Sequence, residues 1–100
     1  MAKLSQIQCR SLMFRYFLTE GWLPAGTNED NWGDVTVRDL ELDDPPLPGS
    51  PDLQKGRAAL DVQNLFHILG SKIPSPLGRL REPALKLREL ADWCGAEQTE

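Results

Sequence analysis

Histidine and cysteine are scarce in this chain, which contains one histidine, His67, and two cysteines, Cys9 and Cys94, near opposite ends. A structural zinc site needs about four Cys or His ligands at close spacing, and a disulfide framework needs paired cysteines. We therefore expect no metal site and no disulfide. The two thiols occupy apolar helical positions and are expected to be reduced and buried, whereas His67 falls on the polar side of its helix.

Recognisable catalytic motifs are also absent. There is no glycine-rich phosphate loop and no nucleophile in an activating motif. In residues 28–39, Gly33 has the spacing of a calcium-loop glycine, but Trp32 occupies a ligand position and Asp39 replaces the usual terminal glutamate. We therefore expect a protein that is not an enzyme, and we assign no catalytic, cofactor-binding or metal-binding residues.

No apolar run in the sequence could span a bilayer. The most apolar stretch, residues 12–18, is interrupted by Arg15, and a spanning helix needs about 20 apolar residues. Polar residues near the N-terminus spoil the apolar region of a signal peptide, so we expect a cytoplasmic protein. A content of 40% hydrophobic and 26% charged residues is typical of a globular chain, and the length fits one small helical domain, residues 1–100.

The apolar pattern predicts a mainly helical fold with three helices, at about residues 5–20, 51–69 and 76–94. In the first helix, Ser5 and Gln8 have the spacing of a capping box. Gly21 stands where a left-handed residue would end that helix. These local signals agree with the apolar periodicity between them.

The second and third helices carry equally local signals. Ser50 followed by proline is a typical helix start, and Gly70 ends the second pattern. The third helix has a seam of apolar residues at alternating three- and four-residue steps, but Pro83 should kink it or split it after Arg81. Residues 96–100 are expected to fray.

A short strand or hairpin is predicted near residues 34–42. Residues 35–38 alternate apolar and polar side chains, and the alternation slips by one residue at Asp39, as at a bulge. One strand cannot stand alone. The region of Trp22 and the same strand in another chain are both possible partners.

The first helix is apolar on two opposite sides when its residues are placed at steps of 100°. One side holds Leu4, Ile7, Phe14 and Leu18, and the other holds Cys9, Leu12, Met13, Tyr16 and Phe17. In a chain of 100 residues, such a helix must lie centrally in the core or meet a second chain.

Exposed aromatic residues favour the second of these possibilities. Trp32 lies in a polar, acidic loop, and Trp93 projects away from the seam of its helix. We therefore predict a protein interface, formed by Met13, Phe14, Tyr16, Phe17, Trp32 and Trp93.

Charge is segregated along the chain, with acidic residues gathered in 29–44 and basic residues in 72–88. Such asymmetry can orient a partner and raise its association rate. Together with the double-sided helix, it predicts a small cytoplasmic regulatory or adaptor protein. We expect it to bind a protein partner, as an inhibitor or antiactivator does, and to form a homodimer.

The alternative is a DNA-binding transcriptional regulator with a degenerate helix-turn-helix around residues 63–82. There the turn at Gly70 is followed by basic residues, although Pro74 and Pro76 disrupt the start of a recognition helix. Residues 87–95 also resemble the first helix and turn glycine of that motif, but only five residues follow them. The formal net charge of −4 opposes binding to nucleic acid.

Overall fold

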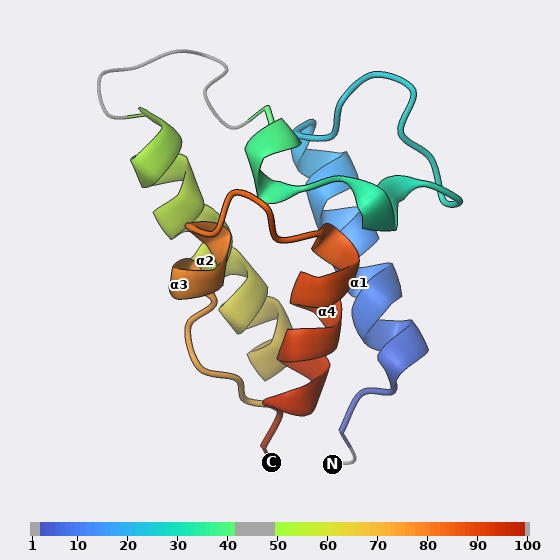
Figure 1. The fold of residues 1–100 in the computed structure, drawn as a ribbon. Helices are drawn as coiled ribbons and strands as arrows, with labels where there is room; N and C mark the ends of the chain where they lie inside the picture. The colour runs from blue at the N-terminus through green and yellow to red at the C-terminus, as the bar shows by residue number, and fades with distance from the viewer. Residues whose placement is uncertain (1–2, 42–49, 100) are drawn as a thin grey trace.

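We describe a computed structural model of the chain, which covers residues 3–41 and 50–99. Three long helices surround a common core (Figure 1), and two short 3-10 turns lie at the end opposite the chain termini. The elements are α1 (Gln6–Glu20), the 3-10 turns η1 (Trp32–Asp34) and η2 (Val37–Asp39), α2 (Ser50–Ile68), the short α3 (Leu77–Leu80) and α4 (Leu87–Ala96). The prediction of a mainly helical fold is confirmed.

Both ends of α1 form as its sequence predicts. The Ser5 hydroxyl accepts from the Gln8 backbone N–H at 3.1 Å, and the Gln8 side chain accepts from the Ser5 N–H at 2.8 Å. At the other end, Gly21 adopts φ 75°, and its N–H bonds back to the last turn. The start and the end of α1 are therefore determined by residues at the two ends of the helix. The predicted Ser50 cap of α2 lies outside the residues whose side chains the structure describes.

The third predicted helix is split at its proline, as expected. It forms α3 and α4, which are separated by residues 81–86, because Pro83 lacks the N–H that a continuous helix requires. Seam residues on both sides of the break are buried, including Leu80 and Leu87 at 0% exposure, whereas Leu77 at the start of the seam is half-buried. Ala84, predicted to belong to the same seam, lies inside the break and is exposed.

The predicted strand near residues 34–42 does not form within the described part of that segment. Residues 32–39 instead build η1 and η2, because the Asp39 carboxylate accepts from the Thr36 hydroxyl at 2.8 Å and turns the chain. What remains of strand pairing is one antiparallel bridge between Thr36 and Lys86. The partner in this bridge is the segment before α4, which the sequence did not suggest. The predicted partner region of Trp22 contributes one backbone bond, in which the Glu41 N–H donates to the Trp22 carbonyl at 2.9 Å. Residue 42 lies outside the described residues.

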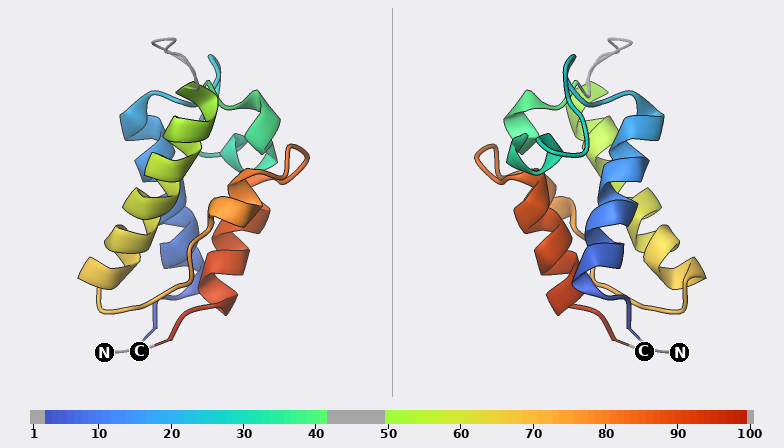
Figure 2. Two further views of the ribbon diagram at one scale, coloured as in Figure 1. Left: turned by 90° about the vertical axis from the view of Figure 1, so that its left-hand side faces the viewer. Right: turned by 90° about the vertical axis from the view of Figure 1, so that its right-hand side faces the viewer.

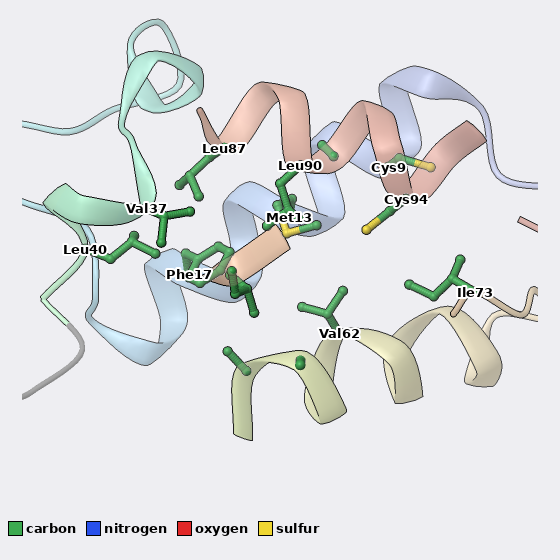
Figure 3. Close-up of a cluster of buried hydrophobic side chains, with 14 of the residues drawn as sticks. Cys9, Met13, Phe17, Val37, Leu40, Val62, Ile73, Leu87, Leu90 and Cys94 are labelled. Atoms are coloured by element: carbon green, nitrogen blue, oxygen red, sulfur yellow. The ribbon is translucent and has the colours of Figure 1, made fainter. Parts of the chain in front are cut away.

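The core is filled from one side of each long helix (Figure 3). Cys9, Met13 and Phe17 of α1 meet residues of α2 and α4 there. The buried apolar residues of the other two helices are Ala58, Ala59, Val62 and Phe66 of α2, and Leu87, Leu90, Ala91 and Cys94 of α4. At the edge of this core, a two-point ion pair between Arg10 and Asp92, at 2.9 and 2.8 Å, ties α1 to α4.

Gln98 joins three distant segments at the end of the molecule where both chain termini lie (Figures 1 and 2). Its carbonyl oxygen accepts from the Leu4 N–H and from the Ser71 hydroxyl, both at 2.8 Å. Its amide nitrogen donates to the carbonyl oxygens of Leu4, at 2.9 Å, and Gly95, at 3.0 Å. Gln98 is 3% exposed, so these bonds satisfy a buried amide.

The expected fraying of the C-terminus is therefore wrong as far as Thr99. Backbone bonds in both directions connect Lys72 and Thr99, at 2.7 and 2.8 Å, beside the Gln98 network. Nothing in the sequence indicated that Gln98, a polar residue two positions after the end of α4, would be buried. Within the described residues, no helix is both long and apolar enough to cross a membrane.

We predict that Gln98→Leu lowers the free energy of unfolding by about 2–3 kcal/mol, because it leaves buried donors and acceptors without partners. Urea denaturation followed by circular dichroism measures this change. The matched control is Glu97→Leu at the exposed neighbouring position, which should change stability by no more than about 0.5 kcal/mol. Equal effects at the two positions would contradict the role of the Gln98 network.

Candidate functional site

Two of the six predicted interface residues, Met13 and Phe17, lie in the core of the single chain. Their side chains are 1% and 0% exposed, between α2 and α4. A partner cannot reach them while the chain is folded, so the interface prediction does not hold for this pair. The sequence showed that α1 has two apolar sides but not which of them faces its own chain.

Phe14 and Trp32, by contrast, meet at the surface beside α1. Both are half-buried, and their ring centroids are 5.8 Å apart. Trp32 begins η1, which an ion pair between Asp34 and Arg88, at 3.1 Å, holds against α4. A Cβ atom at Gly33 would lie 3.1 Å from the Arg88 Cβ, so a side chain at this position would fit only after a shift of a few tenths of an ångström between η1 and α4.

Two exposed residues continue the apolar surface on this outer side of α1. Ile7 is 80% exposed and Leu18 is 51% exposed. With Phe14 between them, they form a line at helical spacing, which we call the α1 outer stripe. The sequence placed these residues on one side of the helix but left Ile7 and Leu18 out of the predicted interface. Because both residues share a helix face with Phe14, the sequence pattern could have placed them in the predicted interface.

Trp93 is half-buried and lies away from the α1 aromatic residues. The Arg79 guanidinium stands 5.5 Å from the centroid of its ring, a cation–π contact between α3 and α4. Arg79 also bonds to Glu82 at 3.0 Å. Trp93 contacts α3, whereas its neighbour Asp92 contacts Arg10 of α1. The structure therefore does not bring Trp93 together with Phe14 or Tyr16.

Tyr16 forms the centre of the contact between α1 and α2. Its hydroxyl donates to the Asp61 carboxylate at 2.7 Å, and its ring packs edge-on against Trp22, with centroids 6.0 Å apart. Burial raises the pKa of Tyr16 above its ordinary value, and the hydrogen bond to Asp61 raises that pKa further. The phenol is therefore held neutral and oriented.

The partners of α1 and α2 follow an antiparallel register. Glu20 pairs with Arg57 at 2.7 Å, and Tyr16 bonds to Asp61 one turn along each helix. One turn further, the register reaches Leu12 and Leu65, which line an open hollow of about 250 Å³. We call this hollow the α1–α2 groove. It is lined by Leu12, Arg15, Tyr16, Thr19 and Leu65, and the surface that these residues expose to it consists almost entirely of carbon atoms.

The remaining titratable candidates do not form a reactive site. His67 is exposed, as predicted, and lines a shallow hollow of about 280 Å³ with Lys72 and polar residues of α2. Cys9 and Cys94 are free and buried, and burial raises the pKa of Cys94 to about 12, which disfavours its reactive thiolate. Among the residues that the structure describes, no three His, Cys, Asp or Glu side chains gather as metal ligands.

Neither stretch considered for DNA binding forms a helix-turn-helix. After α2 ends at Ile68, the chain continues without helix to α3, which has four residues and is too short for a recognition helix. In the second stretch, Gly95 lies inside α4 rather than in a turn.

Comparison of the chain with protein-family models, with curated proteins and with solved structures found no match.

The single tyrosine makes the polar contact between α1 and α2 testable. Because the folded state raises the pKa of Tyr16, it favours the neutral phenol, and stability is lost as pH rises above the unfolded pKa of about 10. We expect tyrosinate absorbance to appear at higher pH in the folded protein than in urea.

The control for this titration is Tyr16→Phe. Its free energy of unfolding should be about 1 kcal/mol lower at neutral pH and should lack the part of the alkaline decline that Tyr16 causes. Folded and unfolded titrations that coincide would show that Tyr16 is neither buried nor bonded to Asp61.

Proposed function

We propose that the chain is a small cytoplasmic regulatory or adaptor protein that acts by binding a protein surface, as an inhibitor or antiactivator does. The observation that carries this proposal is the exposure of Ile7 and Leu18 on the same outer side of α1. The opposite side of that helix fills the core, and Ile7 and Leu18 remain exposed on the outer side.

The α1 outer stripe has the composition of a contact surface. Ile7 and Leu18 project from a regular helix, and the paired rings of Phe14 and Trp32 lie between and beside them. Burying such side chains stabilises a complex by about 25 cal/mol for each Å² removed from water. Aromatic residues that are already held in place lose little conformational freedom on binding, which favours affinity.

We further propose that one partner is a second copy of the chain. A helix face can meet its own symmetry mate across a two-fold axis, which makes the same stripe self-complementary. A chain of 100 residues also gains from extending its small core across an interface. The acidic residues beside η1 and the basic residues of α3 and α4 would then influence orientation and association rate.

We predict that the wild-type protein sediments as a dimer at micromolar concentration and that Leu18→Glu weakens the dimer at least about tenfold, since it places a charge in an apolar contact. Analytical ultracentrifugation over a concentration series measures this change. The matched control is Leu60→Glu, because Leu60 is an exposed leucine of α2, outside the stripe. If the wild-type protein is a monomer at every concentration of the series, the proposed homodimer is wrong.

Binding to other proteins is tested separately with the same pair of variants. Wild type and Leu60→Glu, used as bait in extract from the native cell, should retain the same protein, whereas Leu18→Glu should lose it. If all three baits retain the same protein, the α1 outer stripe is not the contact surface.

A further inference from the structure

The α1–α2 groove is a second exposed apolar feature, on a different side of α1 from the outer stripe. It is an open hollow of about 250 Å³. Leu12, Tyr16 and Leu65 supply apolar walls on two helices, and the partly buried hydrogen bond of Tyr16 to Asp61 orients one of these walls. The groove therefore offers room for a large apolar side chain.

Arg15 supplies a positive charge at the edge of this groove. The carboxylates of Glu20 and Asp61, on the two facing helices, already contact Arg57 at 2.7 and 3.5 Å. Arg15 is exposed at the groove and forms no ion pair with any residue that the structure describes. A ligand carboxylate placed beside the apolar side chain would thus find a cation that has no competing partner in the described structure.

The apolar surface continues past the groove along α2. Ile68 follows Leu65 by three residues on the same flank of the helix and is 76% exposed, and Leu69 beside it is 43% exposed. A ligand with apolar side chains at helical spacing could therefore contact the groove and the end of α2 together. This arrangement matches the recognition of an amphipathic helix by a groove between two helices.

We propose that the α1–α2 groove binds an acidic amphipathic helix of a partner protein. One large apolar side chain of that helix enters between Leu12 and Leu65, and a carboxylate about one turn away pairs with Arg15. This inference rests on the proposed role in protein binding but uses a surface separate from the α1 outer stripe.

A second copy of the chain does not supply such a helix. The only acidic residue of α1 is Glu20, which already contacts Arg57. In α4 the acidic residues accompany leucines that are fully buried, and the one acidic side chain described in α2 is Asp61, which bonds to Tyr16. Among the described residues, no helix of this chain combines an exposed apolar side chain with an uncommitted carboxylate. We therefore assign the acidic helix to another protein rather than to the described helices of this chain.

The test uses two synthetic helical peptides of equal length, with leucines at three- and four-residue spacing. One carries glutamate and the other lysine at the remaining positions. With isotopically labelled protein, NMR titration should show saturable shifts at Leu12, Tyr16 and Leu65 for the glutamate peptide, which should bind at least about tenfold more tightly than the lysine peptide. Arg15→Glu should reverse that preference.

Two control variants distinguish binding at the groove from a general effect of protein charge and from binding at the α1 outer stripe. Arg38→Glu changes an exposed cation in η2 and should leave the peptide preference unchanged. Leu18→Glu should leave peptide binding at the groove intact even when it breaks the dimer. The experiments can therefore disprove binding at the groove while they support binding at the outer stripe, or the reverse.

Three outcomes would overturn the inference. The first is the absence of groove shifts with either peptide, and the second is equal binding of the two peptides by wild type and Arg15→Glu. The third is a concentration-dependent shift at the groove without peptide, which would show that a second copy occupies it. Circular dichroism of Arg15→Glu, and of the milder Arg15→Gln, establishes that the variants are folded before binding is compared.

Discussion

Helix α1 can turn only one of its two apolar sides toward the core, and this constraint determines the character of the rest of the molecule. Cys9, Met13 and Phe17 occupy the inner side, where α2 and α4 close around them. Ile7 and Leu18 are left outside, because none of the elements in residues 3–41 and 50–99 covers them. The exposed surface is thus a direct consequence of how the core is filled.

Polar contacts hold the helices in register at the two ends of this core. At one end, Arg57 pairs with Glu20 and Asp61, and its guanidinium lies 5.9 Å from the centroid of the Trp22 ring. At the other end, the Gln98 amide connects the segment before α1 with the segments that follow α2 and α4. The α1–α2 groove lies one turn further along both helices from the Tyr16–Asp61 hydrogen bond.

Features encoded by neighbouring residues could be predicted from the sequence. The capping box of Ser5 and Gln8, the left-handed Gly21 and the break at Pro83 all depend on local chemistry, and all three form. The strand near residues 34–42 failed for a related reason, since the Asp39 carboxylate competes with strand pairing by bonding to Thr36. A periodic pattern of four residues could not reveal that competition.

Features that depend on distant residues could not be predicted. Nothing near Gln98 indicates that Leu4 and Ser71 will surround it, so the C-terminus was expected to fray. The sequence included Tyr16 in the predicted contact surface but not Leu65, because the groove exists only once α1 and α2 lie antiparallel. The two apolar sides of α1 were visible from periodicity, whereas the choice of inner side depends on the tertiary packing.

The contact between Gly33 and Arg88 connects the surface of the protein to a position with no side chain of its own. A side chain at position 33 would meet the Cβ of Arg88 at 3.1 Å, so Arg88 or η1 must shift by a few tenths of an ångström to accept it. Trp32 begins the same turn, and its ring packs against Phe14 of α1. The face that α1 presents to solvent is therefore coupled to a contact between two other elements.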